Sequence, residues 1–416
     1  MQFHGGSTAE LESVPESAWP ALLRALDDHG LTLPLGIRRG NALPCFVQAR
    51  IERNLADNAQ RHTRLVEAYR EVTSALQVRG IGYAVLKGLS RWPYYCSDLR
   101  HRPSYDIDLY CPENAISRAL AVLTELGYEP VHAGSHRETD HLPRMIRKTG
   151  WTWRQNYYDP EMPLAVELHF RFWDEVTEHF STGDTSLFWH RRVIRDVAGM
   201  PLPVLNPVDA LSYSALHLVR HLLRGALRLH HVYEMGHFLE ASAADDAFWA
   251  EWRDTGLASC RGLEAIAFRV AREWFQCDIH PVAREAVEQL PHSVERWFEL
   301  FGNSPALIAG SPNKNELWLH CCLLTSARDR REIVLRRLFP VRRGRVILNP
   351  HVQPDRTSLR MRIEGRRYAC VFLAQRAAHH CAAIVQTLRS GLLWWRVSNR
   401  SPALRPRKPH SGTRER

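Results

Sequence analysis

The sequence has no long apolar run and no recognisable leader segment. Within its 416 residues, the best candidate for an apolar run of about twenty residues, 368–388, is interrupted by Arg376, His379 and His380. The N-terminal stretch MQFHGGSTAELESV has no cationic segment followed by an apolar stretch, as a secretory signal would. A membrane span is therefore excluded as the default, and we expect a cytoplasmic protein.

The cysteines also lack the spacing that disulfide frameworks and zinc ribbons require. There are nine of them, scattered between positions 45 and 381, with no CxxC pair. An odd, irregular set of this kind is typical of reduced thiols that act as small apolar groups. This interpretation agrees with a cytoplasmic location.

Acidic residues are scarce in the C-terminal part of the chain. Residues 328–416 carry 22 basic and 5 acidic side chains, whereas residues 1–327 carry 33 basic and 40 acidic ones. This asymmetry favours contact with an anionic partner, although a solvated basic face with a frayed end explains it as well. The last stretch, 401–416, is rich in proline and arginine and is predicted to be disordered.

Hydrophobic periodicity divides the chain into four segments. Residues 1–80 are predicted to be mainly helical, 81–205 to form a small α/β domain, 206–400 to form a helical domain, and 401–416 to be a basic tail. Within the α/β domain the pattern predicts strands at IGYAVLKG and SYDIDLY, and a helix over PENAISRALAVLTELGYEP. It also predicts a hairpin formed by WTWRQNYYD and PLAVELHF.

The strand SYDIDLY carries an aspartate pair of the form DxD. Side chains alternate along a strand, so Asp106 and Asp108 face one side while Ile107 and Leu109 face the core. Two carboxylates so close repel each other unless a cation lies between them, and Mg²⁺ prefers such oxygen ligands. On the later strand, Glu167 would complete a two-metal arrangement for phosphoryl chemistry, with Mg²⁺ as the expected ion and Mn²⁺ as the alternative.

Other residues nearby are suited to binding phosphate. Lys87 and Gly88 stand where the first strand meets a turn, so a backbone can approach a phosphate there while a cation pairs with it. Ser90 would add a hydroxyl. Arg102 precedes the aspartate pair and is a candidate clamp for a triphosphate, with Arg100 as a weaker one.

These motifs, in this order, resemble the uncharacterised nucleotidyltransferase family, which has the polymerase-β-type fold. The resemblance rests on LKG, on RPSYDIDL at 102–109, on LGY at 126–128 and on VELHF at 166–170, and it covers about 81–240. It implies an α/β core with a mixed sheet, flanked by N-terminal and larger C-terminal helical regions. It also implies that Gly88 forms the turn, Asp106 and Asp108 the metal pair and Glu167 the third carboxylate, for transfer of a nucleotidyl group from an NTP to an acceptor.

Simpler explanations stay open for several residues. A DxD pair also occurs on exposed strand ends without a metal, and Glu167 could belong to a surface ion pair. His169 shares the face of Glu167 and could touch substrate, orient the carboxylate or simply pack. His217 and His221 are one helical turn apart, but chance pairing is the better account in a chain with 22 histidines. Trp394 and Trp395 could bind a surface or pack against the helical domain.

The sequence thus predicts a metal-dependent nucleotidyltransferase with catalytic Asp106, Asp108 and Glu167. Its substrates would be an NTP and an unidentified acceptor, which could be a small molecule, a peptide or a protein. The alternative is a non-catalytic nucleotide- or nucleic-acid-binding protein that retains the fold. The sequence gives neither the acceptor nor the base of the nucleotide.

Overall fold

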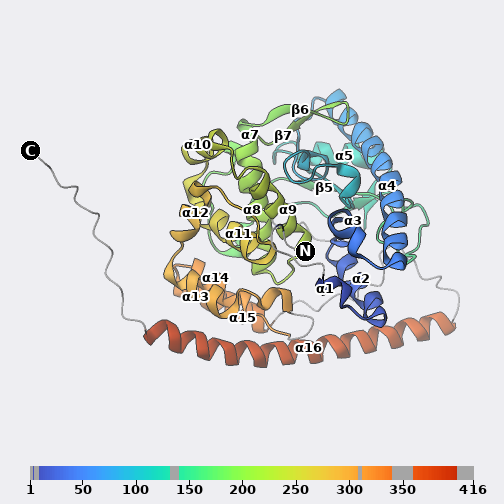
Figure 1. Ribbon diagram of the computed structural model, residues 1–416. Coiled ribbons are helices and arrows are strands. Elements are labelled where there is room, and N and C mark those ends of the chain that lie inside the picture. The colour runs from blue at the N-terminus through green and yellow to red at the C-terminus, as the bar shows by residue number, and fades with distance from the viewer. Residues whose placement is uncertain (1–2, 4–8, 132–139, 308–311, 340–358, 401–416) are drawn as a thin grey trace, which may run out of the picture. The chain divides into compact units, whose positions relative to one another are not determined.

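The computed structural model describes residues 3, 9–131, 140–307, 312–339 and 359–400, and it contains two compact units (Figure 1). The first comprises Met1–Leu290 and Arg342–Leu373, and the second Pro291–Val341 and Ala374–Arg416. The sheet and every candidate site residue belong to the first unit. The predicted basic tail, 401–416, lies outside the described residues.

The N-terminal part of the first unit is helical, as predicted. It contains α1 (Ala9–Glu12), α2 (Trp19–Asp28), α3 (Thr32–Arg39) and the long α4 (Cys45–Val78). Leu65, Tyr69, Val72 and Leu76 recur on one stripe of α4 and enter the core under the sheet. The N-terminal segment therefore packs against the sheet within the first unit.

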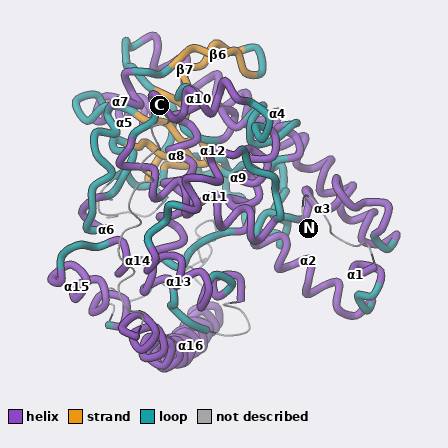
Figure 2. Tube along the Cα trace, turned by 60° about the vertical axis from the view of Figure 1, so that its left-hand side comes forward, coloured by secondary structure: helices purple, strands orange, loops and turns teal. Residues whose placement is uncertain are grey.

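A seven-stranded mixed sheet forms the centre of the first unit, which confirms the predicted fold class. In chain order the strands are β1 (Ala84–Val85), β2 (Asp106–Tyr110), β3 (Glu129–Pro130), β4 (Met145–Ile146), β5 (Ala165–His169), β6 (Val193–Val197) and β7 (Met200–Val204). Their order across the sheet is β3-β4-β5-β2-β1-β7-β6, with β2 parallel to β5 and β1 parallel to β7. Figure 2 shows β6 and β7 as an extended ribbon at one edge of the sheet.

The two faces of β2 differ in chemistry, as the alternation predicts. Ile107 and Leu109 are fully buried among the apolar side chains of α4 and of α5 (Ile116–Glu125). Gly127 follows the C-terminal cap of α5, and its φ of +83° suits a residue without a Cβ. The opposite face of β2 carries the aspartates and lies under α8 (Pro207–Leu223), so it is partly enclosed.

The predicted hairpin is wrong in its first strand. WTWRQNYYD is not a strand, and β5 pairs instead with the short β4. Side-chain hydrogen bonds hold the irregular segment: the Trp151 indole donates to Asp159, and the Arg61 guanidinium donates to the carbonyls of Asp159 and Met162. These contacts satisfy polar groups without sheet pairing and override the local preference of aromatic residues for strands.

Helices make up most of the first unit after β5. The short α6 (Glu175–Glu178) and α7 (Leu187–His190) precede β6, and the sheet is followed by α8, α9 (Leu229–Ala241), α10 (Asp246–Thr255), α11 (Arg261–Phe275) and α12 (Pro281–Glu288). Asn206 caps α8 by accepting from the backbone N–H of Asp209, and Pro207 occupies the first turn. Most of α8 is buried, and it carries several polar side chains toward the sheet.

The second unit is helical throughout its described residues. It contains α13 (His292–Phe301), α14 (Glu316–Leu323), α15 (Ala327–Leu338) and the C-terminal part of α16 (Leu359–Arg400). Trp394 stacks on Trp318 of α14 with ring centroids 5.8 Å apart, so it packs within this unit, whereas Trp395 is exposed. Among the described helices, none combines the length and apolar character needed to cross a membrane.

Candidate active site

Three carboxylates meet where β2 and β5 lie side by side. The parallel register aligns Asp108 with Glu167 and Asp106 with Ala165, so the aspartate pair and Glu167 share one face of the sheet. Their side chains range from fully buried to partly exposed, at 1% for Asp108, 12% for Glu167 and 29% for Asp106. The structure thus brings together the three acidic residues that the sequence singled out.

Two cationic side chains and an imidazole surround this acidic group. Lys87 follows β1, and its Nζ lies 2.8 Å from Asp108 Oδ1. The Arg144 guanidinium lies 2.6 Å from Glu167 Oε1 and 3.4 Å from Asp106 Oδ2. His169 on β5 places its Nε2 3.2 Å from Asp108 Oδ1 and 3.8 Å from Glu167 Oε2. Arg144 and Lys87 therefore balance much of the negative charge.

The carboxylates differ in how well their charge is compensated. Burial, together with repulsion from Asp108 and Glu167, raises the pKa of Asp106 to about 6. Burial also disfavours the charged forms of the other two, but Lys87 holds the pKa of Asp108 below its ordinary value and Arg144 does the same for Glu167. Asp106 is therefore the carboxylate with the greatest need of a further cation.

One unpaired oxygen atom in the acidic group indicates that these residues can bind a divalent cation. Asp108 Oδ2 is buried and has no hydrogen-bond partner among the described residues. An unpartnered, buried carboxylate oxygen is costly unless a cation or donor reaches it. Asp108, Glu167 and His169 also present ligand atoms within 4.8 Å of one another. The oxygen-rich donor set, two aspartates and a glutamate, suits Mg²⁺ or Mn²⁺.

Gly88 and Ser90, expected at the phosphate-binding turn, contact other parts of the chain. Gly88 has a φ of +64°, and a Cβ there would overlap the Tyr69 hydroxyl of α4, so this position requires glycine. The Ser90 hydroxyl donates to the carbonyl of Lys87 at 3.3 Å. Of this turn, Lys87 lines the cavity described below, whereas Gly88 and Ser90 are not among its lining residues.

The two candidate arginine clamps have carboxylate partners. Arg102 Nε donates to Glu234 Oε1 on α9 at 2.7 Å, and its Nη1 donates to the Ser104 hydroxyl at 2.6 Å. Arg100 is exposed and pairs with Asp98. Arg102 reaches the cavity, but its guanidinium is committed to Glu234, a partner from a distant part of the chain that the sequence did not suggest.

A basic cavity of about 440 Å³ opens beside the acidic group. The β2 aspartates, Glu167 and His169 line it, together with cationic and imidazole groups that sequence reasoning missed or set aside: His141, Arg144, His217, Arg220, His221, Arg224, Arg228, His230 and His231. Arg220 pairs with Asp140, and Arg224 with Asp174 and Glu178. Arg228 is exposed and forms no ion pair with any residue that the structure describes. The excess of basic groups favours an anionic ligand.

The comparison with known families identifies the chain at this point. A family model described as an uncharacterised nucleotidyltransferase matches residues 15–276, well over half of the chain. The chain belongs to this nucleotidyltransferase family. Neither a curated protein nor a solved structure matched the chain. Membership supports nucleotidyl transfer as the general activity, and the matched range contains all three carboxylates and the whole cavity lining.

Proposed function

We propose that this nucleotidyltransferase moves a nucleotidyl group from an NTP to an acceptor hydroxyl or phosphate, with Mg²⁺ held by Asp106, Asp108 and Glu167. The main support for this proposal is the alignment of these carboxylates on the neighbouring strands β2 and β5, where they line a basic cavity. The ion, when bound, supplies positive charge that neutralises the leaving pyrophosphate and activates the attacking hydroxyl. Mn²⁺ has the same ligand preferences and is the alternative ion.

Other residues of the cavity would bind the phosphates and orient the metal ligands. Lys87 holds Asp108 ionised and presents an ammonium group to the phosphates. Arg228, exposed in the cavity lining, is the guanidinium best suited to binding the triphosphate tail. His169 donates to Asp108 and fixes its orientation, which supports a positioning role. Arg144 competes with a cation for Glu167 and Asp106, so we expect it to turn toward phosphate when nucleotide and metal bind.

The test is mass analysis of candidate acceptors after incubation with each NTP and Mg²⁺. Small molecules, peptides and proteins, including the chain itself, should be searched for the added mass of one nucleotidyl group. We expect Asp106→Asn and Asp108→Asn to reduce product formation by at least about a hundredfold, because each removes charge from the metal site. Asp254→Asn is a matched control, since Asp254 is exposed on α10 and is not part of the cavity lining.

The binding protein that retains the fold gives a different result in the same assays. It would bind NTPs equally well with and without Mg²⁺, and both aspartate variants would bind as the wild type does. That outcome would refute the proposed transfer reaction and leave a non-catalytic nucleotide-binding protein. We also retain the proposal that the basic C-terminal region contacts an anionic partner, and that the protein is cytoplasmic.

A further inference from the structure

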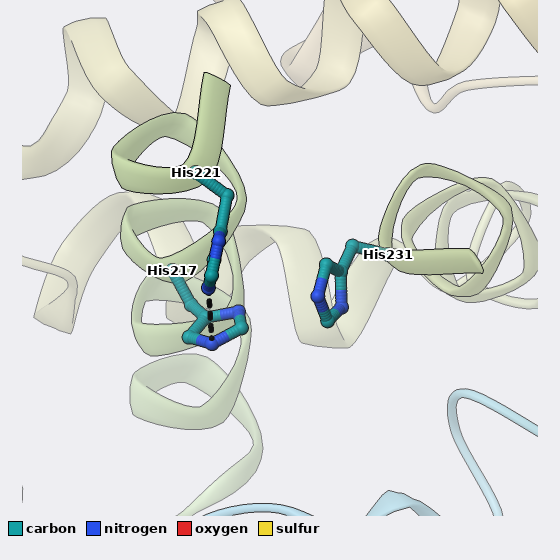
Figure 3. Close-up of side chains that lie close together, drawn as sticks. All are labelled: His217, His221 and His231. Atoms are coloured by element: carbon teal, nitrogen blue, oxygen red, sulfur yellow. Dashed lines mark hydrogen bonds between the residues drawn. The ribbon is translucent and has the colours of Figure 1, made fainter. Parts of the chain in front are cut away.

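Three histidines converge in the cavity lining, where Lys87 lies between His217 and Asp108. His217 and His221 lie one turn apart on α8, and His231 lies near the start of α9. Figure 3 shows the three imidazoles pointing toward one another from the two helices. His217 is 5% exposed and the other two are half-buried, and all three line the cavity. The fold thus makes a cluster from a helical pair that the sequence alone attributed to chance.

The spacing of the ring nitrogens matches that of ligands on a single metal ion. His217 Nε2 and His221 Nε2 lie 3.2 Å apart. Two imidazole nitrogens on a tetrahedral zinc ion, at bond lengths of about 2.0–2.1 Å, are about 3.3 Å from each other. His231 offers its ligand nitrogen within 4.8 Å of those of the other two residues. A small side-chain rotation is enough to bring the third nitrogen into the same coordination sphere.

Burial disfavours charged imidazoles in the cluster, and a bound metal ion would replace the proton that joins His217 Nε2 to His221 Nε2. Burial lowers the pKa of His221 to about 3 and lowers the pKa values of His217 and His231 well below the ordinary value. Neutral imidazoles have a free ring nitrogen to donate to a metal, whereas imidazolium ions have none. His221 Nδ1 is also buried without a hydrogen-bond partner among the described residues. At least one ring nitrogen of the cluster therefore has no hydrogen-bond partner among the described residues.

We propose that His217, His221 and His231 bind one divalent transition-metal ion of the zinc class, with the fourth coordination position open to the cavity. Imidazole ligands suit Zn²⁺, Cu²⁺, Fe²⁺ and Ni²⁺, whereas the carboxylates of the acidic group suit Mg²⁺. Three protein ligands with one open position are typical of zinc sites that bind water or substrate. The site is chemically distinct from the acidic group and does not depend on the proposed nucleotidyl transfer.

The neighbouring Lys87 opposes this ion and provides an internal test. Its Nζ lies 3.4 Å from His217 Nε2 and 2.8 Å from Asp108 Oδ1. A divalent cation on the histidines repels the Lys87 ammonium group, and this repulsion weakens metal binding. The ammonium group can still pair with Asp108 when the metal is bound. Removing the charge with Lys87→Met should therefore tighten metal binding at the histidines. A purely structural histidine cluster, held by the His217–His221 hydrogen bond, would show no such effect.

The experiment is a Co²⁺ titration of the full chain, purified without a histidine tag and stripped by a chelator. We expect one equivalent of Co²⁺ to bind with the visible absorption bands of a four-coordinate ion, and Zn²⁺ to displace it. Loss of an outer-shell partner already weakens metal sites by about 10- to 100-fold, so loss of a ligand in His217→Gln or His231→Ala should weaken binding by more than about a hundredfold. Far-UV circular dichroism and melting temperature verify that each variant is folded.

Two control variants locate the bound ion. His230→Ala should bind Co²⁺ as the wild type does, because His230 lies beside the cluster but its Nδ1 contacts the carbonyl of His29 at 3.2 Å. Asp106→Asn alters the acidic group and should also leave the Co²⁺ bands unchanged. The proposal is overturned if the wild type binds no stoichiometric Co²⁺ with these bands. It is equally overturned if binding persists in the folded His217 and His231 variants, or is lost only in Asp106→Asn.

Discussion

The ion pair between Arg102 and Glu234 gives the sharpest test of how the segment before β2 is joined to α9. The side chains of Arg102 and Glu234 are only 12% and 9% exposed. A second guanidinium faces the same carboxylate, because Arg91 Nε lies 3.7 Å from Glu234 Oε2. Glu234→Gln keeps the size of the side chain but removes its charge, which leaves two buried guanidinium groups without that counter-charge. Breaking a buried pair from one side costs about 3–5 kcal/mol, so we expect a loss of about 3 kcal/mol in the free energy of unfolding.

The loss should depend on pH in a defined direction. Burial disfavours the charged form of Glu234, but Arg102 and Arg91 outweigh it and lower the pKa of the carboxyl below its ordinary value of 4.5. A carboxyl whose pKa is lowered by folding contributes stability above its unfolded pKa and loses it as the pH falls through the folded pKa. The difference between wild type and Glu234→Gln should therefore be full at pH 7 and shrink below pH 4.5.

Urea unfolding, followed by circular dichroism and tryptophan fluorescence, measures this difference. A double-mutant cycle with Arg102→Met isolates the coupling between the two side chains. A Glu234→Gln protein within about 1 kcal/mol of the wild type at pH 7 would refute the argument, because surface pairs contribute no more than that. If Arg102→Met instead leaves stability unchanged and weakens NTP binding, Arg102 acts as the phosphate clamp that the sequence suggested.

Other changes test separate parts of the structure. Arg228→Gln should weaken NTP binding by about 10- to 100-fold in a calorimetric titration, because it removes one charge-assisted contact; unchanged affinity would exclude Arg228 as a phosphate ligand. Gly88→Ala should destabilise the fold by about 2 kcal/mol in urea, because alanine is strained at positive φ and its Cβ meets the Tyr69 hydroxyl; a neutral effect would contradict the turn geometry. Arg144→Gln should tighten Mg²⁺ binding several-fold, because the guanidinium occupies the carboxylates; weaker binding would contradict this competition. Truncation after Arg400 should weaken association with anionic polymers at low salt, and an unchanged affinity would remove the nucleic-acid proposal.

The acidic half of the site could be predicted because it follows from short-range periodicity. Asp106 and Asp108 share a face through the two-residue repeat of a strand, and the apolar partners Ile107 and Leu109 fix which face is buried. The alternation in VELHF likewise places Glu167 on the polar face of β5. The sequence resemblance then joined the two strands in one sheet, and the structure aligns them residue by residue.

The cationic half could not be predicted because its partners are far apart in the chain. Arg144 precedes a two-residue strand that carries no periodic signal, yet it contacts both Asp106 and Glu167. Glu234 lies 132 residues from Arg102, so no local pattern indicates that this arginine belongs to an ion pair. His231 likewise belongs to a different helix from His217. Such pairings follow from helix packing on the sheet, which local patterns do not specify.

Lys87 physically links the acidic group and the histidine cluster. Its ammonium group lies between Asp108 and His217, so a cation bound at either group repels it toward the other. With both ions bound, the negative charge of Asp108 would already be neutralised by a metal, and the Lys87 ammonium would have no carboxylate of its own to pair with. The triphosphate of a bound NTP supplies the missing negative charge, and the exposed guanidinium of Arg228 lines the same cavity. Nucleotide binding should therefore favour occupation of both cation sites, because it gives Lys87 an anionic partner that neither ion removes.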